Sequence, residues 1–262
     1  MRPYAGRRIR SHFFWKDIMN TPFRRIFHSA LLGLCLAAAA PLHAETIDFD
    51  TLAPQALHVG QSIAAGGYLF RGDSGFADAL PTDLVGGILD GGSGACVWLH
   101  CPEGASGSYL AGLNDGVVVI ERADSAAFSI SALSASFIGP YAGAIYPFVP
   151  GILRLEGFRA DRSSVLFDIE LPALGKELSF ADYSTGAFAS EQFVALALFA
   201  FACNQDGACF AFQTNEGQFA VDNLELVSAV PEPGAWIMLG VGLLGLFAYR
   251  RHDRKAVREV KE

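Results

Sequence analysis

Basic residues are scarce in the middle of this 262-residue sequence. Residues 45–229 contain six Lys or Arg against 22 Asp or Glu, a net charge of −16, whereas residues 1–44 carry seven basic residues against one acidic residue. Nucleic acids are bound through clustered Lys and Arg that neutralise phosphates, so the acidic middle argues against a nucleic-acid partner. A surface of this charge suits cations, or a protein that must stay soluble outside the cell.

Catalytic motifs are lacking as well. Of the six histidines only His58 and His100 lie within residues 45–229, and no G-x-S-x-G motif occurs. Glycoside hydrolysis needs two carboxylates that flank a cleft, and the nearest pair is Asp168 and Glu170. Carboxylates two residues apart on one strand are explained equally well by a face in contact with solvent. We therefore predict that the protein is not an enzyme.

The N-terminal segment lacks an apolar run long enough to span a bilayer unaided, because its apolar residues extend only from 30 to 40. Two arginines precede this run and Ala44 follows it, a pattern typical of a secretory signal peptide. We predict a signal peptide over residues 1–44 with cleavage after Ala44. The basic region before the run is unusually long, so we expect Met19 to be the true initiator.

Cysteines are few, and their spacing is local. Of the five, Cys35 lies in the predicted signal peptide, which leaves Cys96, Cys101, Cys203 and Cys209 in C-x4-C and C-x5-C pairs. Four cysteines allow three connectivities, and sequence alone does not choose among them. An oxidising compartment favours one disulfide within each pair, each closing a loop. The alternative is a zinc site, but the usual C-x2-C spacing of zinc ligands is missing.

Residues 45–229 lack a long helical period and instead contain about ten short apolar or alternating runs separated by turn residues. This pattern predicts an all-β domain, a jelly-roll-like β-sandwich. The Gly-rich residues 85–115 are expected to form one long loop tied by a disulfide. The expected strands cover residues 47–49, 67–70, 117–121, 128–138, 152–158, 165–171, 193–203, 209–213 and 219–227.

Three of these strands allow more specific predictions. Residues 165–171 place Val165, Phe167, Ile169 and Leu171 on one face, which predicts a strand with one buried and one wet side. Residues 193–203 are apolar on both faces, which predicts a central strand covered by two layers. Residues 197–203 and 209–213 flank a turn sequence and are expected to pair as a hairpin.

Two ligand classes suit the predicted domain. Asp48 and Asp50 flank the first strand and Asp222 lies in the last, and these two strands often lie side by side in a jelly roll, which would gather oxygen ligands for calcium. Ordinary edge carboxylates are the alternative explanation. Trp98 and Tyr109, in the Gly-rich region, are expected to be exposed and to contact carbohydrate through their rings. No other cofactor is expected.

The C-terminal residues form three short zones in a fixed order. Two prolines stiffen the segment Val230-Pro231-Glu232-Pro233. Residues 235–249 follow as an apolar run, which predicts a single transmembrane helix of about 22 Å, shorter than a hydrocarbon core of about 30 Å. Arg250 and Arg251 favour a cytoplasmic end for this helix. Residues 256–262 are a short charged tail.

These zones resemble the PEP-CTERM sorting signal of Gram-negative, biofilm-forming bacteria, whose substrates are processed by exosortase. The resemblance covers residues 230–255, and a plain single-pass anchor is the alternative. It implies export, temporary anchoring in the inner membrane, and processing near Pro-Glu-Pro, followed by release to the cell surface or extracellular matrix. The expected function is an exopolysaccharide or biofilm matrix component. The alternatives are a jelly-roll carbohydrate-binding module and, less favoured, a glycoside hydrolase.

Overall fold

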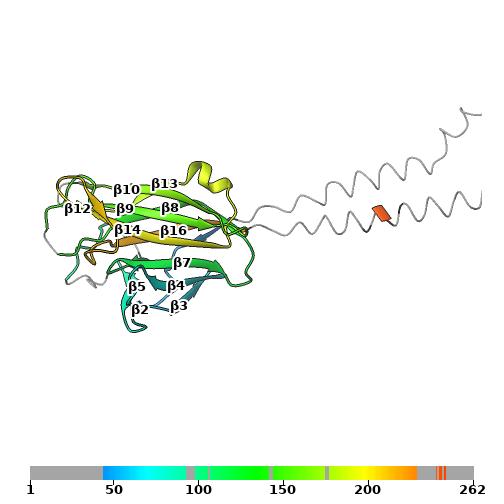
Figure 1. The fold of residues 1–262 in the computed structure, drawn as a ribbon, viewed down its shortest axis with the longest axis horizontal. Coiled ribbons are helices and arrows are strands. Elements are labelled where there is room, and N and C mark those ends of the chain that lie inside the picture. Colours follow the sequence, from blue (N-terminus) through cyan, green and yellow to red (C-terminus); the bar gives the residue numbers. More distant parts are fainter. Residues whose placement is uncertain are drawn as a thin grey trace, which may run out of the picture. The chain divides into compact units, whose positions relative to one another are not determined.

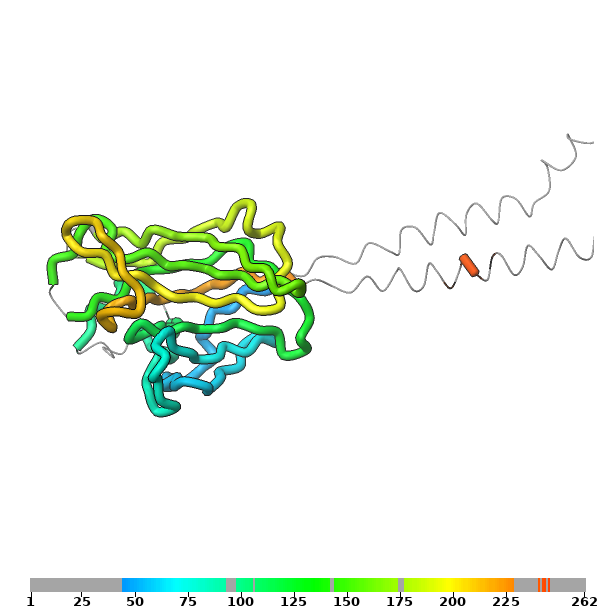
Figure 2. Tube along the Cα trace, viewed as in Figure 1, coloured from blue at the N-terminus to red at the C-terminus, as the bar shows by residue number. Residues whose placement is uncertain are grey.

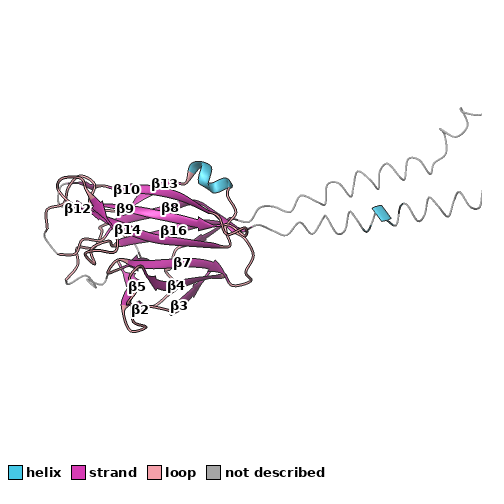
Figure 3. Cartoon of the chain, in the orientation of Figure 1, coloured by secondary structure: helices cyan, strands magenta, loops and turns pink. Residues whose placement is uncertain are grey.

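A computed structural model describes residues 44–92, 98–105, 107–141, 144–174 and 177–228, together with residues 240, 242, 243 and 245. Leu42–Ala229 form one compact unit. Nearly all the regular structure in this unit is β-strand, and a short 3₁₀ helix, η2 (Gly186–Ser190), precedes one strand (Figures 1 and 3). The prediction of an all-β domain is therefore confirmed.

One antiparallel sheet, which we call the β16 sheet, is built around the last strand. Its strands are β1 (Ala44–Ile47), β2 (Gln55–His58), β5 (Leu84–Asp90), β6 (Ser108–Gly112), β8 (Phe128–Phe137), β13 (Ala181–Ser184) and β16 (Phe219–Ser228). They lie in the order β13-β8-β16-β6-β5-β2, and β1 also pairs with β16. The first and last strands are thus neighbours, as predicted, with Ile47 opposite Leu224.

The facing antiparallel sheet, which we call the β14 sheet, is built around a central apolar strand. Its strands are β3 (Ser62–Ala65), β4 (Tyr68–Ser74), β7 (Gly116–Arg122), β9 (Gly151–Phe158), β10 (Ser164–Leu171), β14 (Ala195–Cys203) and β15 (Cys209–Phe210). They lie in the order β10-β9-β14-β7-β4-β3, with β15 paired to β14. The short strands β11 (Ala173–Leu174) and β12 (Glu177–Leu178) pair with each other.

The connectivity is that of a jelly roll, as predicted. From β6 onward the chain passes to β7, back to β8, across to β9 and β10, back to β13, across to β14 and back to β16. The β6-β16-β8-β13 order in one sheet and the β7-β14-β9-β10 order in the other result from this path. The tube in Figure 2 traces this path from β1 in blue to β16 in orange.

The core lies between the sheets and follows from side-chain alternation. In β10, Ile169 and Leu171 are buried while Leu166, Asp168 and Glu170 are exposed, which confirms the predicted strand with one wet side. Strand β14 is central, as predicted, but the expected covering layer on its second face is wrong. Its inward residues, such as Leu198, are buried, whereas outward Phe199 and Phe201 are only half-buried.

The prediction that residues 85–115 form one long loop is also wrong. Strands β5 and β6 lie in this region and pair with each other, Gly87 opposite Ala111. A Cβ atom on Gly86 would collide with the carbonyl oxygen of Ala111, and one on Gly87 would collide with that of Gln55. The glycines are therefore needed because neighbouring backbones approach closely within the sheet, and they do not indicate a loop.

The chain enters and leaves the sandwich at the same end. Ala44 is opposite Val227 in the β1–β16 pair, and Ser228 is the last residue of β16. The connections from β8 to β9 and from β14 to β15 lie at the opposite end (Figure 2). We call the loops at that far end of the sandwich the loop end; they are separated from Ala44 and Ser228 by the length of the sheets.

Several predictions fall outside the described residues. These are the signal peptide before residue 44, Cys96, the motif 230–233, and Arg250 with Arg251. Within the predicted membrane helix, residues 235–249, the four described positions are helical. No helix among the described residues is both long enough and apolar enough to span a membrane.

Candidate functional site

Loops that are distant in sequence meet at the loop end. His100 and Gly139 exchange backbone hydrogen bonds of 2.9 and 2.8 Å, which join the loop before β6 to the loop after β8. The His100 ring also lies 5.4 Å from the ring of Tyr146. The Gln205 side-chain amide donates to the carbonyl of Ile145 at 3.3 Å, which adds the β14–β15 turn. Three loops thus form one continuous surface.

This surface carries strongly exposed apolar side chains. Trp98 is 85% exposed, Tyr141 63%, Ile145 70% and Phe148 74%, and we call these four residues the loop-end patch. The backbones of two of them are held in place, since the Tyr141 carbonyl accepts from the Tyr146 hydroxyl at 3.0 Å and the Phe148 carbonyl accepts from the backbone N–H of Ala173 at 2.9 Å. Exposed rings on a fixed backbone are suited to ligand binding, because little conformational entropy is lost on contact.

Trp98 and Tyr109, the two predicted carbohydrate contacts, differ in exposure. Trp98 is exposed as expected. Tyr109 is only 1% exposed, so the expectation that it is exposed is wrong. It packs against Phe180 at 5.4 Å in a second, smaller core on the outer face of the β16 sheet, where Leu99 and Ala105 cover it. Burial raises the pKa of Tyr109 to about 12.

Sequence reasoning missed Ile145 and Phe148, and it named Tyr141 only as one of six aromatic residues that could stack on a sugar. Tyr141, Ile145 and Phe148 lie in the connection between β8 and β9, whose apolar residues show neither the alternation of a strand nor the period of a helix. Apolar residues without periodicity, placed between prolines, are the signal that indicates an exposed loop here.

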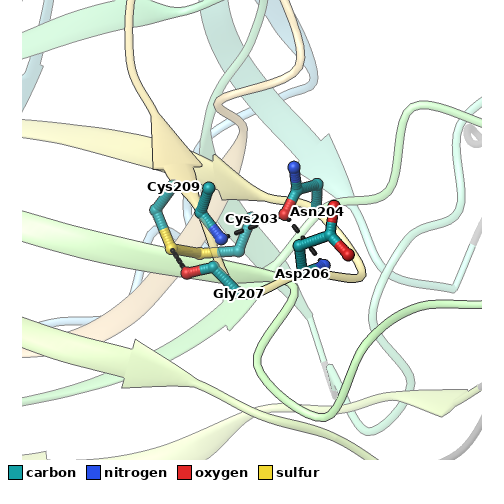
Figure 4. The surroundings of a disulfide bond; sticks show 6 residues. Cys203, Asn204, Asp206, Gly207 and Cys209 are labelled. Carbon is teal, nitrogen blue, oxygen red and sulfur yellow. Dashed lines mark hydrogen bonds between the residues drawn. A yellow bond between two sulfur atoms is a disulfide. The ribbon is translucent and has the colours of Figure 1, made fainter.

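The predicted local disulfide in the β14–β15 turn is confirmed. Cys203 and Cys209 are bonded, with their sulfur atoms 2.02 Å apart, and the two residues are also opposite each other in the β14–β15 hairpin (Figure 4). The Asn204 side-chain carbonyl accepts the backbone N–H groups of Asp206 and Ala208, both at 3.0 Å, so the turn is also held from inside. Cys101 is disulfide-bonded too, and its predicted pairing with Cys96 involves a residue outside the described part of the chain.

A buried carboxylate fixes the loop that follows β15. Asp115 is buried, and its carboxylate accepts backbone N–H groups from residues 213, 214, 215 and 217 at 2.6–3.3 Å. A carboxylate with this many backbone donors satisfies polar groups that would otherwise be left buried without hydrogen bonds. The loop over residues 213–217 is therefore fixed to the start of β7.

The three proposed calcium ligands lie near one another, because β1 pairs with β16. Burial raises the pKa of Asp222 to about 6, and the negative charges of Asp50 and Asp48 contribute to this shift. The Asp50 carboxylate accepts the backbone N–H of Ser108 at 2.9 Å. Within the described residues, no group of three His, Cys, Asp or Glu side chains is arranged to hold a metal ion. Calcium binding by Asp48, Asp50 and Asp222 stays a prediction.

The carboxylates considered for hydrolysis lie on a sheet surface. Asp168 accepts two hydrogen bonds from Arg154, at 2.7 and 2.6 Å, and Glu170 follows two residues later on the exposed face of β10. The side chain of His58 contacts the carbonyl of Thr82 at 2.9 Å, and His100 lies at the loop end. A carboxylate held by arginine on a flat face is explained by structure without a catalytic role.

Comparison with known proteins identifies the C-terminal segment. The family model described as "PEP-CTERM protein-sorting motif" matches residues 229–255. No curated protein matches the sequence at a significant level.

Solved structures show only weak likeness to the chain. A DUF4465 family protein from Bacteroides ovatus is 11% identical, with 73% of this chain and 97% of that chain covered and a TM-score of 0.36. A mutant of the family 29 carbohydrate-binding module CBM29-2 in complex with cellulohexaose is 12% identical, with 69% and 97% covered and a TM-score of 0.31. Scores this low carry no argument about ligands. The motif match is specific, and the chain is therefore a protein that carries a PEP-CTERM sorting motif.

Proposed function

We propose that this protein is a non-enzymatic component of the cell surface or extracellular matrix that binds extracellular polysaccharide through the loop-end patch. The PEP-CTERM motif implies export to the cell surface or extracellular space and processing by exosortase. The sandwich domain is then the part that acts outside the cell. Its acidic composition, with a net charge of −16 over residues 45–229, is compatible with a soluble exported domain.

The exposure of Trp98 is the observation that carries the proposal. An indole ring that is 85% exposed is costly to leave in water, and it offers a flat apolar face to the C–H face of a sugar ring. Tyr141, in the loop after β8, adds a second exposed ring, and its hydroxyl donates to Glu216 at 3.2 Å. A ligand bound at this end leaves the opposite end, where the chain continues to the sorting motif, free for anchoring and processing.

Localisation of the full chain tests the sorting part of the proposal. In a host with exosortase, a Glu232→Ala, Pro233→Ala double variant should stay in the membrane fraction as unprocessed precursor, because the segment recognised for processing is altered. A Glu177→Ala variant, at an exposed position outside the motif, should be processed and released like the wild type. Identical processing and release of the double variant and the wild type would show that the motif is not used.

Polysaccharide pull-down of the exported protein tests the binding part. Trp98→Ala should reduce retention on insoluble polysaccharide by about tenfold or more, equivalent to about 1.4 kcal/mol of binding free energy, whereas Trp98→Phe should retain part of it. Val194→Ala, which shortens an exposed apolar residue after η2, should have no effect. If wild type and Trp98→Ala are retained equally, or neither is retained on any polysaccharide, a matrix role without glycan contact at this site replaces the proposal.

A further inference from the structure

The outward face of the β14 sheet carries apolar residues that the sandwich does not bury. Strand β14 contains alternating inward and outward residues, and inward Leu198 and Ala200 belong to the main core. Outward Phe199 and Phe201 are half-buried and belong to neither core of the described domain. The strand has the apolar composition of one covered on both sides, yet only one side has a covering sheet.

Two loop residues extend this pair into a row of phenyl rings. The ring of Phe212 lies 5.2 Å from Phe199, and the ring of Phe76 lies 6.4 Å from Phe212. Phe199 and Phe201 are 5.8 Å apart. Phe76 and Phe212 are half-buried and also lie outside both cores. We call these four residues the phenylalanine row. Gly75 makes the arrangement possible, because a Cβ there would collide with the Phe212 ring.

Paired charges flank the row on the same face of the sheet. The Arg154 guanidinium lies 4.8 Å from the centre of the Phe201 ring, and the same group donates both hydrogen bonds to Asp168. Asp168, Arg154 and Phe199 are directly opposite one another on β10, β9 and β14. On β4, the Arg71 side chain pairs with Asp73 at 3.1 Å. Planar polar groups with both donors and acceptors thus lie on two sides of the apolar row.

We propose that the phenylalanine row is a second binding surface, which takes an extended neutral polysaccharide chain. The four rings, whose centres lie 5.2–6.4 Å apart from one to the next, form a continuous apolar strip against which consecutive sugar units of a polymer can pack their C–H faces. The flanking arginine–aspartate pairs offer donors and acceptors to the hydroxyl groups at the rims of the sugar rings. A rigid sheet presents these groups without rearrangement.

Charge decides in favour of a neutral glycan over other occupants. The domain carries a net charge of −16, and exposed Glu170 and half-exposed Glu156 lie on the same face as Arg154. An acidic polysaccharide would meet repulsion at this surface, and so would a second copy of the chain. The phenylalanine row shares no residue with the loop-end patch. The inference rests on the proposed function only for the class of ligand, a polysaccharide. Two surfaces on one molecule would allow it to hold two chains at once.

The test measures affinity of the full, exported protein for mannan and hydroxyethylcellulose as neutral chains and for alginate as an acidic chain. Phe201→Leu is the main variant, because leucine retains an apolar side chain but has no flat ring. In a Trp98→Ala background, where the loop-end patch is disabled, the proposal expects residual affinity for a neutral chain. Adding Phe201→Leu should lower this residual affinity by about tenfold or more. Phe199→Leu should act in the same way, and Val194→Ala should leave the affinity unchanged.

Each alternative result has a defined meaning. If Phe201→Leu melts like its parent and binds neutral chains equally well, the proposal is wrong. A preference for alginate over both neutral chains, or a change in sedimentation of Phe201→Leu without a change in glycan binding, would also overturn it, in favour of an acidic ligand or self-association. If Trp98→Ala abolishes all binding, the loop-end patch is the whole site and the row is not one. If Trp98→Ala has no effect while Phe201→Leu weakens binding, this proposal stands and the loop-end site fails.

Discussion

The outer faces of the two sheets differ in how deeply their aromatic residues are buried. On the β16 sheet, Tyr109 points outward but is covered by Leu99, Ala105 and Phe180, so that it joins a second small core. On the β14 sheet, outward Phe201 is half-buried and contacts the guanidinium of Arg154. Both residues are aromatic and lie on interior strands of their sheets. The difference arises because two loop segments cross one outer face and none of the described loops buries the other to the same degree.

The remaining outer surface of the β16 sheet is polar, whereas that of the β14 sheet combines the phenylalanine row with charged side chains. Ser129, Ser134 and Ser136 are buried on β8, and the Ser134 hydroxyl donates to Asp182 at 2.6 Å. Asp222, with its raised pKa, lies on the neighbouring strand. One outer face thus combines a covered apolar end with a polar and acidic region. The other presents a row of rings with polar flanks, which is why only the second suits an apolar contact with a ligand.

The largest expected difference between the two faces is in the stability lost when Tyr109 or Phe201 is truncated to alanine. Tyr109→Ala should lower the free energy of unfolding by about 3–5 kcal/mol, because it leaves a cavity in a packed core. Phe201→Ala should lower it by only about 1–2 kcal/mol, since the ring is half-buried and outside both cores. Urea unfolding of both variants measures the difference. Equal losses would show that the phenylalanine row is a structural core like the one around Tyr109.

A smaller loss of stability is expected when Asp115, which binds the loop that precedes β16, is replaced. Asp115→Asn should lower the free energy of unfolding by about 2–3 kcal/mol, because the amide loses the charge that four backbone N–H groups share. Asp206→Asn, the same change in an exposed turn, should alter it by less than about 0.5 kcal/mol. Amide hydrogen exchange over residues 213–217 should rise only in the first variant. Unchanged protection there would contradict the role assigned to Asp115.

The smallest effect concerns the acidic region of the β16 sheet. The folded pKa of Asp222 is about 6, above its ordinary value of 3.8, so ionisation costs stability as the pH rises through this interval. Asp222→Asn should therefore raise the free energy of unfolding at pH 7 by about 1 kcal/mol, a value reduced for partial solvent screening. The gain should disappear below about pH 4, where the carboxyl group is protonated in both states. Thermal melts across this range measure it, and a gain that persists at pH 3 would contradict the assignment.

The same melts test the calcium prediction. Calcium bound by Asp48, Asp50 and Asp222 would raise the melting midpoint of the wild type at pH 7, and Asp222→Asn would reduce that shift. An unchanged midpoint of the wild type at millimolar calcium would remove calcium from the account of this region.

Much of the fold was predictable because it depends on local alternation. The pattern of β10 determined both its strand and its buried face, and the turn between Cys203 and Cys209 predicted the hairpin and its disulfide. Strands β2 and β3 were missed, because each is four residues long with little apolar alternation. Strands β5 and β6 were missed because glycine, which indicates a loop by composition, is required here by close backbone contact.

The sequence by itself determined the sorting motif and the inner faces of the strands. The motif is a run of consecutive residues, and the inner face of a strand is given by every second residue, so both depend on local patterns. Only the tertiary structure decided which outward aromatic residue is covered. Tyr109 and Phe201 are both aromatic residues in apolar strands, and the path of distant loops buries the first and leaves the second half-buried. The same long-range packing brought Trp98, Tyr141, Ile145 and Phe148 to the loop end. Loop paths depend on contacts between residues far apart in the chain, and no local pattern contains them.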